Sequence, residues 1–501
     1  MSVLARGGNA VDAAIAANAV QGVVAPETCG VGGDLFALVF APGWDRPLAL
    51  NSSGRAGSGA EAASLRDRGL DSVPQRHPAA VTVPGCVDGW LTLHSELGVM
   101  TLANVLEPAI AVAEGGFPAS REFTHAFASR ADELREEPSA TDMYPSGTPP
   151  VEGGRHTRRR LAQTLRAVIE GGRDAFYAGA VGAAISGATN GLITAGDLEV
   201  SQAEWVTPLA AELFGSRGWT MPPNSQGYIV LSALAAVERI GLGDPEDPAT
   251  WHLIVESYRL AAADRDLRLA EPSGMDVEAT ELVSKRRIDE LAAAFDPDHV
   301  RSLGTPREAS GGTAYLCCVD ANGMGVSLIQ SNFHGIGSGR SVGEAGFLLN
   351  DRGRGFTLTP GHPNELAPGR RPLHTLAPTI WTSGTGLEMV LGTRGGHQQP
   401  QLVIQLATRI AGHRLEPAIA MTMPRWTMEN PRPGDMVSRL EVEPGTPPAV
   451  VEGLAARGHQ VSQLEYPQVG WGPMSAICVD GDGLRIACAD PRVDTATSAA
   501  T

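Results

Sequence analysis

The sequence predicts an α+β protein with a two-layer β-sheet core and helices outside it. Segments with helical apolar periodicity and strand-like segments both occur in each half of the chain. Beyond residue 313, the strand-like segments follow one another through Gly turns such as "DANG" at 320–323. The chain has 501 residues, of which 43% are hydrophobic. This length exceeds a typical single core, but some large sandwiches form one unit.

The first part of the chain supplies most of the predicted helices. An Ala-rich helix is expected over 8–24, and a Gly turn and two strands follow it within 28–59. Apolar residues spaced i, i+3, i+4 predict several helices within 85–170. Further on we expect a Pro-Gly turn opening into a helix (219–241), a long helix (249–270) and a Pro/Gly/Ser/charged linker (295–312).

From Thr313 onward, strands predominate. The expected strands cover 313–320, 323–331, 346–351, 373–383 and 387–393. Helices are expected over 399–412 and 449–458, and a closing pair of strands over 475–480 and 485–490.

Charge and hydropathy exclude several classes of function. The net charge of −17 argues against nucleic acid or an anionic membrane as a partner, because phosphate contacts need a basic face. The one basic cluster, "RHTRRR" at 155–160, is interpreted as a solvated helix start. No apolar run reaches the roughly 18 residues needed to span a bilayer. The first residues lack the regions of a secretory signal, which predicts a cytoplasmic location.

No metal or cofactor is expected. The six cysteines form no CxxC pair, and no HExxH motif occurs. The only lysine, Lys285, lies in a charged helical stretch, so neither a P-loop nor a Schiff-base site is supported. "GRSVG" at 339–343 matches a nucleophile elbow but lacks the strand–turn–helix context. His397 is either a catalytic base or, more often for a loop histidine, a hydrogen-bonded residue.

Thr313 stands where the loose run "EASGG" meets a strand. A threonine hydroxyl can use its own α-amine as the base only when the residue is N-terminal, so an internal threonine must first have the preceding bond cut. Gly312 leaves room for the hydroxyl to attack its carbonyl. Taken alone, these residues favour the simpler alternative of a threonine that starts a strand.

An ordered series of motifs resembles the γ-glutamyltransferase (γ-glutamyltranspeptidase) family of N-terminal nucleophile hydrolases along nearly the whole chain. The series is highly specific in this order: "GGNAVDAAIAANAV", "ETCGVGGDLFALV", "VPGCVDGW", "LEPAIAVAEGGF", "GLITAGDL", "MPPNSQG", "ESYRLAAADR", "RRPLHTLAPTI", "GTRGG", "MPRW" and "ADPR". The resemblance implies a four-layer αββα sandwich and a precursor that cleaves itself between Gly312 and Thr313. A large subunit (1–312) and a small subunit (313–501) would then form one structural domain, with a homodimer of this heterodimer left open.

The resemblance also implies roles for individual residues. Thr313 would be the nucleophile that attacks a small-molecule amide donor, with water or an amine as the acceptor. Ser331 falls where the family has a threonine that supports the nucleophile. Gly395 and Gly396 match the glycine pair whose backbone N–H groups form the oxyanion hole.

The donor-binding positions depart from the family's pattern. His374 and Thr375 stand where the family has two serines, and Arg352 and Gly355 where it has the glutamine and aspartate that reach the donor's α-amine. Arg55 lies about two positions beyond the family's donor-carboxylate arginine. An arginine repels an ammonium group and prefers carboxylates. Alternatively, Arg352 pairs with Asp351 or a surface acid, and another group holds the amine.

These departures predict a γ-glutamyl-type enzyme of an atypical branch, whose donor is a γ-glutamyl amide or a related dicarboxylic monoamide without a free α-amine. The alternatives are a glutaryl-type acylase or an oxamate-type amidohydrolase without transpeptidation, and an unprocessed homologue that only binds ligand. The short connection from Gly355 to Arg371 suggests an open cleft. The start at "MSVLARGGNA", inside the first motif, suggests either a lost edge strand or a misassigned start codon.

Overall fold

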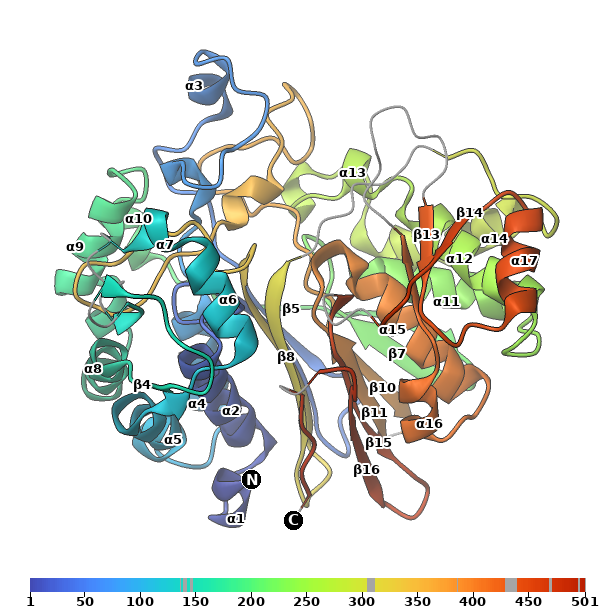
Figure 1. Ribbon diagram of the computed structural model, residues 1–501, viewed down its shortest axis with the longest axis horizontal. Helices are drawn as coiled ribbons and strands as arrows, with labels where there is room; N and C mark the ends of the chain where they lie inside the picture. The colour runs from blue at the N-terminus through green and yellow to red at the C-terminus, as the bar shows by residue number, and fades with distance from the viewer. Residues whose placement is uncertain are drawn as a thin grey trace.

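Two antiparallel β-sheets stack face to face at the centre of the molecule, and helices cover the outer face of each (Figure 1). The computed structural model describes residues 1–135, 137, 142–144, 147–303, 311–384, 386–428, 439–467, 471–493 and 496–500. The layer order is α-β-β-α, which confirms the predicted sandwich. Over these residues, no helix has both the length and the apolar character to cross a bilayer.

The first sheet has the strand order β5-β2-β1-β9-β8, so β8 lies at one edge. Its central strands β1 and β9 are buried along their whole length, which suits strands covered on both faces. The strands are β1 (Asp34–Phe40), β2 (Leu48–Ser52), β5 (Glu204–Val206), β8 (Gly312–Val319) and β9 (Gly325–Phe333).

The second sheet has the order β16-β15-β11-β10-β7-β6. Its strands are β6 (Leu209–Leu213), β7 (Ser216–Thr220), β10 (Thr379–Ser383), β11 (Gly386–Thr393), β15 (Met474–Val479) and β16 (Arg485–Ala489). Side chains such as Phe36, Ile329, Ile380 and Val390 fill the space between the two sheets. Residues before and after Thr313 contribute strands to both sheets, so the two parts of the chain share one core.

Two groups of helices form the outer layers (Figure 1). The first sheet is covered by α2 (Ala10–Val24), α4 (Cys86–Leu97), α5 (Leu102–Gly115) and α8 (Arg159–Tyr177), with α9 (Gly179–Ala188) and α10 (Ala195–Glu199) beside α8. The second is covered by α11 (Tyr228–Ile240), α12 (Pro248–Ala262), α14 (Lys285–Ala294), α15 (Gln399–Ala407) and α17 (Pro448–Ala456). Shorter helices are α1 (Ser2–Ala5), α3 (Ala62–Arg66), α6 (Arg121–Ser129), α7 (Ala131–Leu134), α13 (Arg265–Arg268) and α16 (Pro417–Thr422). Small sheets are formed by β3 (Phe117–Pro118) with β4 (Arg155–His156), and by β12 (Trp426–Met428), β13 (Arg439–Val442) and β14 (Gln460–Gln463).

Helix α2 begins at a capping box that also ties it to the first sheet. The Asn9 side chain accepts a hydrogen bond from the Asp12 backbone N–H, and the Asp12 carboxylate accepts one from the Asn9 N–H. These bonds satisfy donors that a helix start leaves without partners. The Ala10 N–H donates to the carboxylate of Asp320 at 3.0 Å. Asp320 follows β8, so the helix start is fixed against the end of the strand that carries Thr313.

The expected strand over 346–351 is wrong. Within this segment only Leu348 forms a β-bridge, to Ser341. Its backbone N–H groups bond instead to three separate parts of the chain: Leu349 to Arg340 and Asn350 to Gly32, both in loops, and Asp351 to Asn332 near the end of β9. An apolar run needs a neighbouring strand in register to become a strand, and among the described residues this run forms only the single Ser341–Leu348 bridge.

Two other expectations are adjusted. The strand expected over 373–383 begins only at Thr379. Of the expected linker, residues 295–303 contain no helix or strand and 304–310 lie outside the described residues, while Gly312 already belongs to β8.

Candidate active site

Thr313 is the second residue of the edge strand β8 and is 1% exposed. The register between β8 and β9 shifts between Gly312 and Ala314, so Thr313 lies in a β-bulge. A bulge turns a side chain away from the direction that strand alternation would give it. Thr313 therefore stands at an irregularity in the backbone, with Gly312 on its N-terminal side.

A single hydroxyl connects Thr313 to the peptide bond before it. The Thr313 Oγ1 hydroxyl donates to Ser331 Oγ at 3.2 Å, and the Ser331 hydroxyl donates to the Gly312 carbonyl at 2.7 Å. The Phe333 N–H donates to the same Ser331 oxygen at 2.8 Å, which fixes its position. Ser331 lies on the buried strand β9, opposite Asp34 of β1. This arrangement can polarise the Gly312 carbonyl beside a hydroxyl able to attack it.

Gly312 is confined by neighbouring backbone. A Cβ atom at this position would lie 2.8 Å from the Glu27 carbonyl and 2.9 Å from Gly335 Cα. Any larger residue would force the Gly312–Thr313 peptide or its neighbours to shift. The close backbone approach explains why a glycine is needed at the start of β8, while the room it would leave for the Thr313 hydroxyl to attack stays a prediction.

The glycine pair 395–396 forms the turn between β11 and α15, next to the segment that precedes Thr313. Gly395 has a φ of 123°, and a Cβ atom on it would lie 2.4 Å from the Trp471 carbonyl. A Cβ atom on Gly311 would lie 3.6 Å from the Gly396 nitrogen. Gly396 thus lies against Gly311, one residue before the Gly312–Thr313 bond.

His397 is committed to a structural hydrogen bond. Its Nδ1 lies 3.3 Å from the Gln226 side-chain oxygen, while Gln226 Nε2 donates to the carbonyls of Thr375 and Gly396. Burial, with Arg265 nearby, holds the pKa of His397 well below its usual value, so the ring is neutral. Through Gln226 it supports the glycine turn.

Arg352, predicted to face a substrate, forms a closed buried cluster with an acid 318 residues away in the sequence. Its Nε donates to Asp34 Oδ2 at 2.7 Å, and His374 Nε2 lies 2.8 Å from the same oxygen. The guanidinium also covers the Phe333 ring, with its carbon 4.1 Å from the ring centroid, and Nη1 lies 3.4 Å from Thr375 Oγ1. The partner of Arg352 is therefore Asp34, not Asp351 or a surface acid.

The cluster carries no net charge at neutral pH. Burial opposes ionisation of Asp34, but Arg352 and His374 outweigh it and lower the pKa of this carboxyl. Burial and the charge of Arg352 lower the pKa of His374 to about 4, so the imidazole is neutral. A Cβ atom at Gly355 would lie 2.8 Å from the Leu373 carbonyl, which leaves no room there for an acidic side chain.

Arg55 lies apart from the residues around Thr313. Its guanidinium pairs with Glu204 at 3.3 Å, and the same carboxylate accepts from Arg371 at 2.7 Å. Arg55 is not among the described residues that line the two cavities at Gly312 and Thr313. The structure thus brings together Thr313, Ser331, Gly396 and the Arg352 cluster, and leaves Arg55 in a separate ion-pair group.

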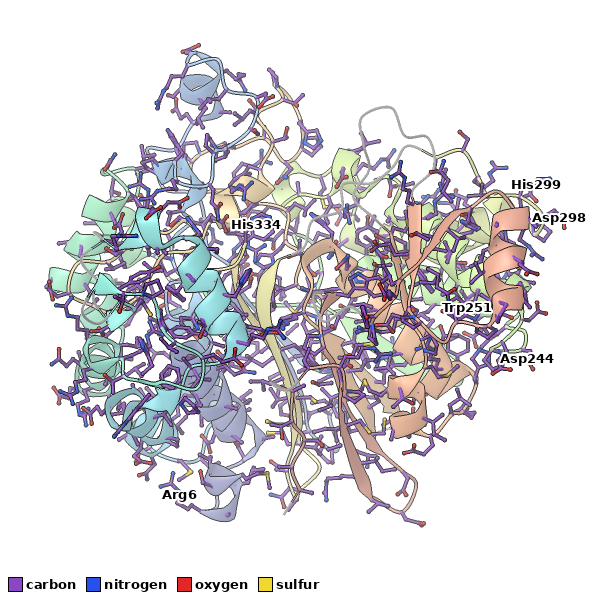
Figure 2. The ribbon with its side chains drawn as sticks, viewed as in Figure 1. Arg6, Asp244, Trp251, Asp298, His299 and His334 are labelled. Atoms are coloured by element: carbon purple, nitrogen blue, oxygen red, sulfur yellow. The ribbon has the colours of Figure 1, made fainter. Side chains whose placement is uncertain are left out.

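Two adjoining cavities reach the Gly312–Thr313 bond. One, of about 630 Å³, runs along β8 from Thr313 to Cys318 between α2 and the β15–β16 edge of the second sheet. The other, of about 450 Å³, is lined by Gly311, Gly312, His334 and Gly335 together with Thr28 and the three charged residues below. Figure 2 labels His334 near the upper end of β8.

Glu27, Glu122 and Arg394 line both cavities, and sequence reasoning singled out none of them. Arg394 donates to both oxygens of Glu122, at 3.0 and 3.2 Å. Burial, reinforced by the nearby Glu122, raises the pKa of Glu27 to about 8. The available signals were their positions: Glu27 directly precedes "TCGVGG", and Arg394 directly precedes the glycine pair.

An αββα sandwich with a threonine at the head of an edge strand, beside a glycine turn, defines an N-terminal nucleophile hydrolase. The gamma-glutamyltranspeptidase family model matches residues 1–500, and the chain belongs to this family. It is 34% identical to the glutathione hydrolase-like YwrD proenzyme of Bacillus subtilis, over 99% of this chain and 94% of that protein. It is also 34% identical to the oxamate amidohydrolase proenzyme of Klebsiella pneumoniae, over 99% and 95%.

Among solved structures, the cephalosporin acylase from Bacillus halodurans superimposes with a TM-score of 0.90 at 31% identity, covering 98% of this chain and 92% of that one. The matched relatives are hydrolases, acylases and transpeptidases. The chain is accordingly an enzyme of this family, an amidohydrolase of the N-terminal nucleophile class. The predicted family and the predicted type of enzyme are both confirmed.

Proposed function

We propose that the protein is a self-processing N-terminal threonine amidohydrolase that cleaves a dicarboxylic monoamide through an acyl-enzyme on Thr313. The observation that carries this proposal is the Ser331 hydroxyl, which contacts both the Thr313 hydroxyl and the Gly312 carbonyl. One side chain thereby aligns a nucleophile with an electrophile across the peptide bond that must break.

Maturation follows from this geometry. Thr313 Oγ attacks the Gly312 carbonyl carbon, and the Ser331 hydroxyl stabilises the developing oxyanion. The C–N bond breaks as the proton lost by Oγ passes to the Thr313 nitrogen, which becomes a free α-amine, and Gly312 remains as an ester on Oγ. Water then hydrolyses the ester, which leaves a carboxylate on Gly312. The resulting chains, 1–312 and 313–501, stay together because both contribute strands to each sheet.

The mature enzyme uses the same atoms on a substrate. The freed α-amine of Thr313 accepts the proton from Oγ as the hydroxyl attacks the donor's amide carbonyl. Backbone N–H groups of Gly395 and Gly396 stabilise the tetrahedral oxyanion. The Thr313 α-amine then passes its proton to the donor's amide nitrogen, and this nitrogen leaves as an amine. Water, or an amine acceptor, then releases the acyl group from Thr313.

The charges around Thr313 favour a donor without a free α-amine. An ammonium group needs an ionised carboxylate that is not already paired. Asp34 is committed to Arg352 and His374, and Glu122 to Arg394. The names of the oxamate amidohydrolase and cephalosporin acylase relatives point the same way. We therefore place the activity nearer these relatives than a γ-glutamyl transferase, the second candidate.

Ser331→Ala should slow self-cleavage by roughly 10²-fold, because it removes one oxyanion donor. The matched control is Ser331→Thr, which keeps the hydroxyl and should cleave at a rate close to that of the native chain. Freshly purified precursor is incubated and sampled on denaturing gels, and the rate is taken from loss of the full-length band. Equal rates for the Ser331→Ala variant and the native chain would show that this hydroxyl plays no part in cleavage.

A donor panel tests the substrate class. Glutaryl-p-nitroanilide should give a higher kcat/KM than γ-glutamyl-p-nitroanilide, by about tenfold for one unmatched ammonium group. Oxamate, with release of ammonia as the readout, tests the shortest dicarboxylic monoamide. A clear preference for the γ-glutamyl donor would support the second candidate instead. A single uncleaved band with no activity on any donor would favour an inert ligand-binding homologue.

A further inference from the structure

The cavity on the acyl side of the Gly312–Thr313 bond has a polar wall that the proposed chemistry does not use. Gly311 and Gly312, which carry the acyl group of the scissile bond, face Glu27, Glu122 and Arg394 across this cavity. When Thr313 is freed, the acyl group of a donor takes the position of Gly312. Whatever lies at the far end of that acyl group therefore meets this wall.

Glu27 lines both cavities and carries a buried polar atom that has no partner among the described residues. The residue is 6% exposed, and its Oε2 has no hydrogen-bond partner among the described residues. Buried polar atoms nearly always have a hydrogen-bond partner, so an unpaired carboxyl oxygen on a residue that lines a cavity points to a ligand as the missing partner. With its pKa raised to about 8, mainly by burial, Glu27 carries a proton at neutral pH and can donate a hydrogen bond.

Arg394 has donors to spare. Only its Nη2 contacts Glu122, and its Nε and Nη1 have no protein partner within the part of the chain that the structure describes. The side chain is 18% exposed, so it is held in place yet reachable from the cavity. A guanidinium with free donors recognises a planar carboxylate with two parallel hydrogen bonds.

We propose that Glu27 and Arg394 form the subsite for the distal carboxylate of the acyl donor, with Arg394 supplying the charge and the neutral Glu27 acid a hydrogen bond. This inference rests on the proposed amidohydrolase function and names the group that its donor must carry. The sequence had predicted Arg352 and Arg55 as the substrate-binding arginines. In the structure Arg352 pairs with Asp34 and Arg55 with Glu204, so the new subsite uses a different arginine.

Arg394 directly precedes Gly395, so the carboxylate anchor and the oxyanion turn lie on one short stretch of chain. An acyl group bound between them must be short, with its two carbonyl ends a few carbons apart. Glutaryl amides meet this requirement, and pentanoyl (valeryl) amides match them in length but lack the carboxylate. This pair isolates the contribution of the subsite.

The subsite should weaken as the pH rises through about 8. The groups that face Glu27 are Glu122, Arg394, Arg158, the Cys29 thiol and, across the cavity, His334. Below its pKa, Glu27 is neutral and donates a hydrogen bond. Above it, Glu27 becomes a second anion, loses the donor and repels a substrate carboxylate, so KM for that donor rises.

Kinetics of three processed variants test the subsite. Arg394→Gln should lower kcat/KM for glutaryl-p-nitroanilide by roughly 10- to 100-fold, through KM, while valeryl-p-nitroanilide changes by less than about threefold. Glu122→Gln is the matched control, since it removes a charge from the same wall but frees Arg394. It should lower KM for the glutaryl donor. Equal losses on both donors in the Arg394 variant would overturn the proposal.

Glu27→Gln supplies an independent readout, because the amide keeps a hydrogen-bond donor but cannot titrate. In the native enzyme, KM for the glutaryl donor should rise up to about tenfold per pH unit above 8, whereas the variant should show no such rise. An unchanged alkaline rise in the variant would exclude Glu27. If the native chain does not cleave itself, or hydrolyses none of the donors, the proposed amidohydrolase function is refuted. Failure of the subsite and failure of the proposed function therefore give different results.

Discussion

We expect Thr313→Ala to stay a single chain of 501 residues and to hydrolyse amide donors at a negligible rate. The alanine removes the hydroxyl that Ser331 holds beside the Gly312 carbonyl, so on the proposed mechanism the precursor cannot form the ester that leads to cleavage. Without cleavage there is no α-amine at residue 313 to serve as the base. We expect kcat/KM to fall by roughly 10⁴-fold or more, as in other enzymes that lose their nucleophile.

Thr313→Ser is the matched control. Serine keeps the hydroxyl but lacks the methyl group that restricts χ1, so more of the chains hold the oxygen away from Gly312. Cleavage should proceed, more slowly than in the native chain, and mass spectrometry of the small subunit should give an N-terminal serine. Cleavage between residues 312 and 313 in the alanine variant would remove Thr313 from the mechanism.

Co-expression of the two halves separates maturation from catalysis. Residues 1–312 and 313–501 share both sheets, so they should assemble only when expressed together. With the N-terminal Thr313 exposed by an aminopeptidase or a cleavable leader, the assembled pair should hydrolyse the donor without self-cleavage. The same pair carrying Thr313→Ala should assemble equally well and remain inactive.

Many elements of the fold were predictable because they depend on local patterns. Composition and apolar patterning were enough to predict the Ala-rich helix at 8–24, the helices within 85–170 and the strand at 387–393, whereas the four-layer αββα order followed from the family resemblance. Patterning failed at 346–351, where an apolar run packs against the helical layer, with Phe347 stacked on Phe176 of α8, and forms only one β-bridge among the described residues. Apolar patterning reports burial, and it does not identify the neighbour that covers the buried face.

The candidate site shows the same limit. Thr313 and Ser331 lie on adjacent strands joined by a short turn, so their proximity follows from local structure. The pairing of Asp34 with Arg352 does not, because it requires β1 to lie beside β9 and residues 318 apart to meet. Glu27 and Arg394 likewise meet only through the fold, so sequence reasoning passed over both.

Some motifs that carried the family resemblance prove to hold the fold together. Arg425 of "MPRW" and Asp490 and Arg492 of "ADPR" form a buried ion network with Glu443. Arg425 and Asp490 are each at most 1% exposed. A motif can thus identify a family without belonging to its active site.

Asp34→Asn should destabilise the protein by about 3–5 kcal/mol, the usual cost of leaving one partner of a buried ion pair unpaired. Both Asp34 and Arg352 are fully buried, so no water can replace the lost carboxylate. His374 cannot compensate, because its own pKa is already low beside Arg352. Both the variant and its reference should carry Thr313→Ala, which keeps every chain uncleaved, and urea unfolding followed by tryptophan fluorescence gives the difference.

Arg352→Met should cost less and should change how stability depends on pH. Asp34 then keeps His374 at 2.8 Å as a partner, and without the arginine the imidazole can take up a proton to neutralise it. The pKa of His374 would rise above its unfolded value of about 6.5, so the stabilisation is present at lower pH and is lost as the pH rises through the new pKa. The reference chain has the opposite dependence, since its His374 titrates at about 4, and stability contributed by the neutral ring falls between pH 6.5 and 4. Parallel pH profiles for the two chains would mean that His374 does not exchange roles with Arg352, and that the cluster is held by packing around Phe333.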